Sequence, residues 1–310
     1  MDMQSKNISI FGAKFKILKN LVLLFLMCFS VSLFSQHKVG VRTGLNYSKY
    51  SGPLEPGESY GISNGFHFGI SYMYKLPDFP IGFKGELLYT QRGSKQNFLD
   101  SLSYLIIDPI APANLETFIE TGKKDLELDI TAGYLSIPLT VHYKPIKKFE
   151  FLAGASLDFL VGPSARGNVE FVSKDRPDEI RFIQSLDHGY GSDGAGEYNT
   201  FNNENIIILV DGEQVTVPKI IGAYYDFTTE QRQRGNRLNG FNAHLIGGLN
   251  YFVNGQFYIG ARYEYGLLDV TNNAVDYSLS ELDNNSEFIF RDDSDKPYTI
   301  SISIGFTIGS

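Results

Sequence analysis

Cysteine is almost missing from this chain: Cys28 is the single one among 310 residues, and it lies in an apolar run near the N-terminus. Disulfide bonds are therefore not expected to stabilise the folded part. Tryptophan is missing as well, so the aromatic content consists of 24 Phe and 19 Tyr. Positive charge is in deficit, with 27 Lys and Arg against 35 Asp and Glu. Nucleic acid is not expected as a partner, since binding it requires a basic face.

Long apolar runs are also scarce. One run, residues 21–34, is preceded by three lysines and followed by Ser35. This order of a basic, an apolar and a small-residue segment predicts a signal peptide at residues 1–35, cleaved before Gln36. A membrane anchor, which needs about 20 apolar residues, is the disfavoured alternative. Cleavage removes four lysines and one aspartate, which takes the net charge from −8 to −11.

The remaining domain, residues 36–310, has no further segment that could cross a membrane as a helix, so insertion would require strands. Eight segments show the alternation of apolar and polar residues that is typical of a transmembrane strand about ten residues long. In the last one, Ile300, Ile302 and Ile304 alternate with serine and glycine. The segments are 38–47, 65–75, 81–96, 134–143, 149–162, 240–252, 256–266 and 298–309.

Large aromatic residues gather near the ends of the apolar faces. The ten steps from Phe241 to Tyr251, at about 3.3 Å each and a tilt of about 45°, span roughly 23 Å, which matches the apolar band of an outer-membrane barrel. Aromatic girdles flank that band at both interfaces. The predicted girdle consists of Tyr47, Phe66, Tyr74, Tyr89, Tyr143, Phe159, Phe241, Tyr251, Phe257, Tyr265, Tyr298 and Phe306.

The connections between the eight segments alternate between long and short. This alternation predicts an up-and-down antiparallel β-barrel in the outer membrane, with short periplasmic turns, long external loops and both termini in the periplasm. The longest connection, residues 163–236, is predicted as a large external loop insertion. It contains a hairpin signal around Asp211 and Gly212. A ten-stranded barrel, in which this hairpin crosses the membrane, is the alternative to eight strands.

Charged residues occur on the inward faces of several strands. An eight-stranded barrel has an interior just wide enough for side chains to fill, and buried charges there must pair. We therefore expect a lumen charge network without a catalytic role, a cofactor or a metal. Alternatively, the charged residues line an open path through the barrel. Packing of Leu88, Tyr134 and Tyr258 between the charges would instead indicate that the lumen is plugged. The network consists of Arg42, Lys84, Glu86, Arg92, Glu150, Asp158, Arg262 and Glu264.

The stretch "RDDSDKP", residues 291–297, gathers three aspartates in the last external connection. A solvated acidic loop is expected there. A Ca²⁺ site is the alternative, since that ion prefers several oxygen ligands.

Three stretches resemble one known family, the PorT-like outer-membrane β-barrel proteins of Bacteroidota. "GELLYTQRGSK" is similar to the family's Glu-Leu-Leu-Tyr-x-x-x-Gly-x-Lys strand, "YLSIPLTVHYK" to its Tyr-Leu-x-Ile-Pro-Leu strand, and "RYEYGLLDV" to its late Tyr-x-Tyr-Gly-Leu strand. The position of Ser136 is often Glu in that family. The resemblance covers most of residues 36–310 outside the large loop, and it implies an integral outer-membrane barrel.

The founding member of this family belongs to the type IX protein secretion apparatus. The resemblance therefore implies a non-enzymatic scaffold or partner in an envelope or secretion assembly, acting through its external loops. A narrow porin-like channel for small solutes is the alternative, and an outer-membrane enzyme is the least favoured. Expected partners are outer-membrane lipid, lipopolysaccharide and the barrel-assembly machinery, which would read Phe306 as the penultimate aromatic signal.

Overall fold

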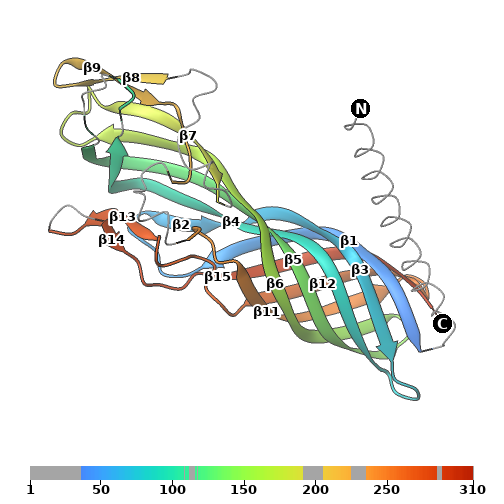
Figure 1. Cartoon of the computed structure of the whole chain (residues 1–310). Helices are drawn as coiled ribbons and strands as arrows, with labels where there is room; N and C mark the ends of the chain where they lie inside the picture. Colours follow the sequence, from blue (N-terminus) through green and yellow to red (C-terminus); the bar gives the residue numbers. More distant parts are fainter. Residues whose placement is uncertain are drawn as a thin grey trace, which may run out of the picture.

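The computed structural model describes residues 36–107, 109–111, 116, 118–190, 205–224, 235–284 and 288–309. The expected signal peptide lies outside these residues. Eight strands form a closed antiparallel ring (Figure 1), in which β1 pairs with β15 to complete the circle. In ring order they are β1 (His37–Ser51), β3 (Ser63–Lys75), β4 (Ile81–Ile107), β5 (Phe118–Ile146), β6 (Phe149–Ser173), β11 (Phe241–Phe252), β12 (Phe257–Gly266) and β15 (Lys296–Ile308).

The eight-stranded barrel is thus confirmed, and the ten-stranded alternative is wrong. The hairpin around Asp211 and Gly212 does form, as β8 (Asn205–Val210) and β9 (Glu213–Pro218), but it makes a separate two-stranded sheet. Both turn residues have positive φ, at 53° and 84°, which the tight connection requires. Within the described ranges, no helix is long and apolar enough to cross a membrane.

The ring is apolar outside and polar inside. On β15, Ile300, Ile302 and Ile304 are about half exposed, whereas Ser301 and Ser303 between them are buried. A barrel in water would bury the isoleucines, so this inversion matches a barrel whose outer surface contacts lipid.

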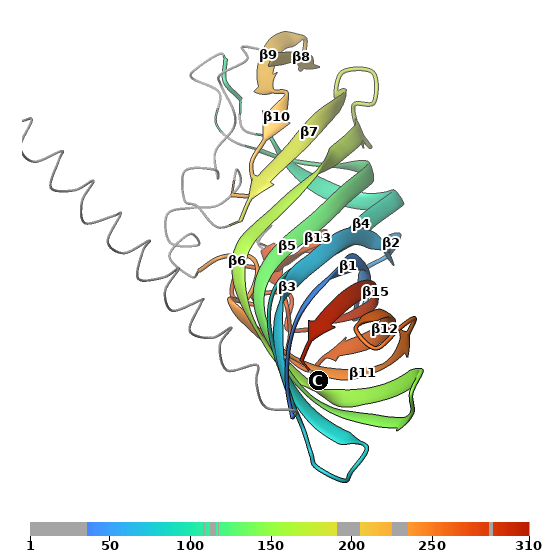
Figure 2. The same cartoon turned by 90° about the vertical axis from the view of Figure 1, so that its right-hand side faces the viewer.

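The two ends of the barrel differ. The connections at residues 76–80, 147–148 and 253–256 are short, and they lie at the end where β1 begins and β15 finishes (Figure 1). We call this the short-turn end and the opposite one the extended end. At the extended end β4, β5 and β6 continue far beyond the ring, since they contain 27, 29 and 25 residues. Joined by β7 (Arg181–Gly189), they form a wall on one side of the barrel (Figure 2).

The wall corrects the lengths expected for two loops. The long connection predicted between the third and fourth segments is mostly paired strand, because β4 and β5 pair from Ile81 with Tyr143 to Ile107 with Phe118, with one register shift between Phe98 and Ser101. Likewise, residues 163–173 belong to the upper part of β6 instead of a loop. A register shift beside Gly133 lets β6 continue through Pro163, since bulges accommodate proline in a sheet.

The apolar face of β5 changes sides at Gly133. From Leu135 to Tyr143, the outward residues are apolar and exposed. Beyond Gly133, the outward residues are acidic, such as Glu127, and the apolar residues, such as Leu128, point inward and are buried. The change marks the point where the surroundings of the strand change from lipid to water. We take the segments bounded by the aromatic girdle as membrane-spanning, and call everything beyond them at the extended end the crown.

The crown has a hydrophobic core of two clusters. One cluster lies on the inner face of the wall and includes Phe98, Leu128, Val169 and Leu238. A second cluster packs the hairpin β8–β9 onto the wall through Phe171, Phe182, Val215 and Val217. The remaining crown strands are β2 (Glu58–Gly61), β10 (Ile220–Ile221), β13 (Tyr277–Leu282) and β14 (Phe288–Phe290).

Candidate functional site in the charged lumen

All eight residues of the predicted lumen charge network point into the ring, and each has at most 5% of its surface exposed. Four are cations (Arg42, Lys84, Arg92, Arg262) and four are carboxylates (Glu86, Glu150, Asp158, Glu264). They come from β1, β4, β6 and β12, whose inward positions are polar because the outward positions carry the apolar side chains. The structure brings them together in three groups.

The first group surrounds Glu86. Its Oε1 atom lies 3.5 Å from Arg42 Nε and 3.5 Å from Lys84 Nζ, and its Oε2 atom lies 2.5 Å from Arg262 Nη1. One carboxylate therefore contacts cations from three strands. Glu86 and Arg92 lie on the same face of β4, but they take part in different groups.

The second group surrounds Arg92. Its guanidinium contacts Asp158 at 3.0 Å and Glu264 by a very short ion pair. His244 Nδ1 lies 2.5 Å from the same Asp158 carboxylate. The ring of Tyr134 lies below the guanidinium carbon, with its centroid 5.9 Å away. These contacts join β4, β6, β11 and β12 inside the ring.

The third group lies nearest to the short-turn end. His142 Nδ1 and Asn250 Nδ2 bond the Glu150 carboxylate at 2.7 and 2.8 Å. Lys84 Nζ donates to the Tyr258 hydroxyl at 3.3 Å and lies 5.2 Å from the centroid of its ring. Through Lys84, this group is continuous with the group around Glu86.

Several residues complete the network without being charged. Leu88, Tyr134 and Tyr258 are each at most 4% exposed, and they fill the space between the ionic groups. Ser136 lies beside Asp158 in the pairing of β5 with β6. The PorT-like family, which the sequence resembles, often has Glu at the position of Ser136; in this chain the neighbouring strand carries a carboxylate instead. Asn250 was not among the predicted site residues, although its position on the inward, polar face of β11 could have identified it.

The inward histidines have separate partners. His67 bonds the Asn46 carbonyl oxygen at 2.8 Å and the Ser303 hydroxyl at 3.1 Å, whereas His244 lies against Asp158. Within the part of the chain that the structure describes, no three His, Cys, Asp or Glu side chains form a group that could hold a metal ion.

The predicted girdle residues are all exposed or half-buried on the outer face of the ring. Neighbouring members touch across strands: the ring centroids of Phe159 and Phe241 are 5.4 Å apart, and those of Phe66 and Tyr89 are 5.7 Å apart.

A second charged site lies in the crown at the extended mouth of the barrel. Arg291 contacts Glu58 at 3.6 Å and Asp293 at 2.5 Å. Tyr60 donates to Asp295 at 3.0 Å. Asp295 is only 1% exposed, so the expectation of a wholly solvated acidic loop is wrong: the segment folds back onto β2 and is partly buried.

Burial dominates the ionisation of this mouth. It raises the pKa of Asp295 to about 7; the hydrogen bond from Tyr60 opposes this, and the nearby Asp293 adds to it. The pKa of Asp276 rises to about 6, again mainly through burial, against the attraction of Arg291. Arg291 has its own pKa raised by the surrounding carboxylates, against the effect of burial. The mouth is thus a site where charge changes near neutral pH.

A family model described as "outer membrane protein beta-barrel domain" matches residues 34–272. No curated protein matches the sequence. Among solved structures, the chain is similar to the attachment invasion locus protein Ail of Yersinia pestis, at 12% identity and a TM-score of 0.33, covering 88% of this chain and 99% of that one. It is also similar to OprG from Pseudomonas aeruginosa, at 9% identity and a TM-score of 0.34, covering 89% and 98%.

Proposed function

The chain belongs to the family of outer-membrane proteins with a β-barrel domain, and we propose that it is a non-conducting scaffold whose crown engages another protein of the cell envelope or of a secretion assembly. In this proposal the protein is a PorT-like barrel. Its short-turn end and both termini face the periplasm, and the crown lies outside the cell, as in barrels with short turns on one side and long connections on the other.

The filled lumen is the observation that carries the proposal. Ion pairs from β4 reach β12 and β6 across the interior, and Leu88, Tyr134 and Tyr258 occupy the space between them. Opening a path would separate charges that are nearly inaccessible to water, and leaving one of them unpaired costs about 3–5 kcal/mol. This cost supports a lumen that stays closed, and we infer that the function of the protein lies at its ends.

The crown supplies a surface for a partner. It holds more of the chain than anchoring requires, and it exposes apolar side chains beyond the lipid-facing band. Leu99 is 73% exposed on β4, and Ile183 and Ile207 are 57% and 64% exposed on β7 and β8. Where such residues form a contiguous patch, they mark a protein interaction site.

A catalytic role is not part of this proposal. The lumen carboxylates each contact a cation or a histidine, so their charge is already neutralised by structural partners. In the third group the Thr140 hydroxyl lies 2.8 Å from His142 Nε2, and His142 Nδ1 lies 2.7 Å from Glu150, which is the order of hydroxyl, base and carboxylate that acyl transfer uses. Thr140 is buried and does not line the neighbouring cavity, so its hydroxyl is not presented to a substrate.

Single-channel recording in a planar bilayer tests the proposal, with heat-modifiable gel mobility as the control for folding. We expect the folded protein to be electrically silent. Steady, discrete openings from the folded band would contradict a non-conducting role and favour the alternative.

That alternative is a narrow channel for small solutes. Cavities lie at both ends of the plug: one of about 460 Å³ at the short-turn end, next to Lys84 and Tyr258, and smaller ones of about 140 and 60 Å³ in the crown. A rearrangement of the plug would connect them. Under this alternative, substitution of Arg92 or Glu86 should change the ion selectivity of the openings.

A further inference from the structure

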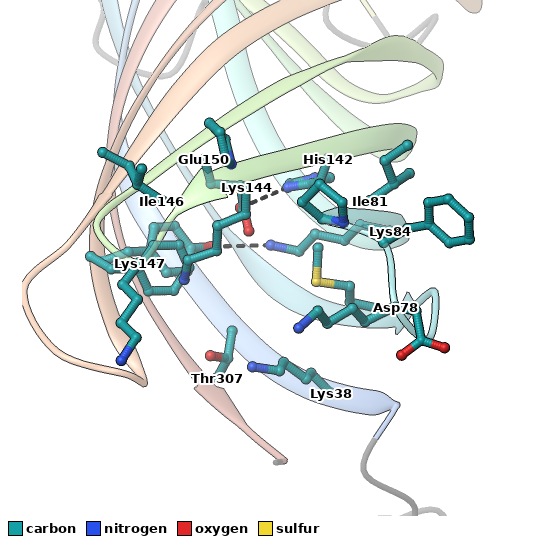
Figure 3. A pocket seen from close by; sticks show the side chains of 18 residues that line it. Lys38, Asp78, Ile81, Lys84, His142, Lys144, Ile146, Lys147, Glu150 and Thr307 are labelled. Atoms are coloured by element: carbon teal, nitrogen blue, oxygen red, sulfur yellow. Dashed lines mark hydrogen bonds and ion pairs between the residues drawn. The ribbon is translucent and has the colours of Figure 1, made fainter.

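The cavity at the short-turn end has a lining that is more basic than the rest of the molecule. It has a volume of about 460 Å³, within the range of small-molecule sites. Five lysines line it, against two acidic residues, in a chain with a net charge of −8. Figure 3 shows Lys38, Lys84, Lys144 and Lys147 arranged around the hollow.

The lysines reach the cavity from separate elements. Lys38 is the second residue of β1, Lys75 ends β3, and Lys84 lies on β4. Lys144 lies near the end of β5, and Lys147 lies in the turn between β5 and β6. Each of these elements places a lysine near the aromatic girdle at the short-turn end. Closure of the ring therefore brings the lysines together at that end of the barrel.

Lys84 pairs with Glu86 inside the lumen, but the two acidic residues of the cavity do not neutralise the other four lysines. Glu150 is taken up by His142 and Asn250, at 2.7 and 2.8 Å, and Asp78 lies in the exposed turn between β3 and β4. In the described part of the chain, no carboxylate lies within ion-pair distance of Lys38, Lys75, Lys144 or Lys147.

The ammonium group of Lys144 is close enough to those of Lys38 and Lys75 for their charges to affect its pKa. This residue lies beyond the membrane-spanning part of β5, with its Nζ atom 3.2 Å from the centroid of the Phe252 ring. Burial lowers the pKa of Lys144, the Glu150 carboxylate opposes this, and the ammonium groups of Lys38 and Lys75 lower it further. Mutual repulsion of this kind is relieved by a bound anion.

We propose that this cavity, the lysine vestibule, binds a phosphate-bearing anion. The geometry suits an anion with two or more charges, since several lysines act as point charges from different sides, whereas a planar carboxylate would favour the fork of an arginine. Lys84 and Tyr258 form the floor, where the plug of the lumen closes the cavity. Two sources share this chemistry: a soluble phosphorylated compound and the headgroup of an anionic phospholipid.

Titration of the full chain with inorganic pyrophosphate tests the proposal. The protein is refolded in zwitterionic micelles, folding is checked by heat-modifiable mobility, and binding is measured by isothermal titration calorimetry. We expect saturable binding that weakens with added sodium chloride. A double variant, K38Q with K144Q, should bind at least roughly tenfold more weakly, since each lost contact at about 4 Å is worth about a factor of five even in water.

A matched double variant provides the control. Lys49 and Lys174 lie in the crown, and K49Q with K174Q removes the same charge from the opposite end of the molecule. Equal pyrophosphate binding by the two double variants, or the absence of saturable binding by the unaltered protein, would overturn the proposal. If K38Q with K144Q does not fold, the single variant K38Q, at the half-buried start of β1, replaces it, with a smaller loss expected.

The source of the phosphate is decided in vesicles. Pyrophosphate binding is compared for protein in phosphatidylcholine vesicles with and without phosphatidylglycerol. If phosphatidylglycerol weakens pyrophosphate binding by the unaltered protein, and has no such effect on K38Q with K144Q, the site belongs to a lipid headgroup. Binding independent of phosphatidylglycerol would assign it to a soluble anion.

Discussion

Arg262 and Glu86 form an ion pair across the full width of the lumen. The Nη1 atom of Arg262, on β12, lies 2.5 Å from the Oε2 atom of Glu86, on β4. In the ring, these two strands are four places apart among eight, which makes them opposite. The contact therefore joins two walls of the barrel that share no backbone hydrogen bonds.

The first prediction follows from this pair. Substitution of Glu86 by Gln leaves Arg42, Lys84 and Arg262 without their common counter-charge, in an interior where an unpaired charge costs about 3–5 kcal/mol. We expect a loss of that order in the free energy of unfolding, measured in urea by heat-modifiable mobility. The exposed Glu213 on β9 is the control: E213Q should leave stability unchanged. Unaltered stability of E86Q would show that the pair does not stabilise the barrel.

The second prediction concerns Gly305, which lies on β15 directly under the ring of Tyr258. A side-chain methyl group at this position would overlap the ring. Because overpacking of a filled interior costs about 1–3 kcal/mol, G305A should lower the free energy of unfolding by that amount and shift the urea midpoint downward. The control is G247A on β11, where a methyl group meets nothing within 4 Å. Equal midpoints for the two variants would contradict the packing of the plug.

The third prediction tests the position of the membrane boundary on β5. Leu139 and Glu127 both point outward on this strand, but they lie on opposite sides of Gly133. An arginine at Leu139 would face lipid and should cost about 2–4 kcal/mol near the centre of the band. The same residue at Glu127 would face water, so E127R should fold as well as the unaltered protein. Comparable destabilisation by both variants would move the boundary.

The fourth prediction is a pH dependence of the crown. Asp295 has its pKa raised to about 7, from an ordinary value near 3.8. The folded state therefore favours the protonated form, so the stabilisation is complete below pH 3.8 and is lost as the pH rises through 7. The groups that face it are Tyr60, Arg291, Asp276 and Asp293.

We accordingly expect the last crown segment to be cleaved more readily by a protease at pH 8 than at pH 5.5. The variant D295N, which cannot ionise, should be resistant at both values, while the barrel keeps its heat-modifiable mobility in every case. A pH dependence that survives in D295N would assign the effect to Asp276, whose pKa is raised to about 6.

The sequence alone determined the barrel itself. The alternation of Ile300, Ile302 and Ile304 with small polar residues settles which face of β15 meets lipid, because a strand has a period of two and one face must be apolar throughout. The same argument applied to the other seven segments yields the eight strands of the ring and the inward direction of all eight charges. Arg42 and Glu264 were assigned to the interior by phase alone, without any information on their partners.

The tertiary structure alone decided which charges meet. Phase places Glu86 and Arg92 on one face of β4, but the tilt and register of the ring decide that Glu86 meets Arg262 and that Arg92 meets Asp158. The crown also depended on three-dimensional packing: the alternation at Leu126, Leu128 and Ile130 is that of an ordinary water-facing strand, and nothing local shows that it continues a membrane strand. The lysine vestibule has the same origin, because its lysines come from β1, β3, β4 and the end of β5 and become neighbours only when the ring closes.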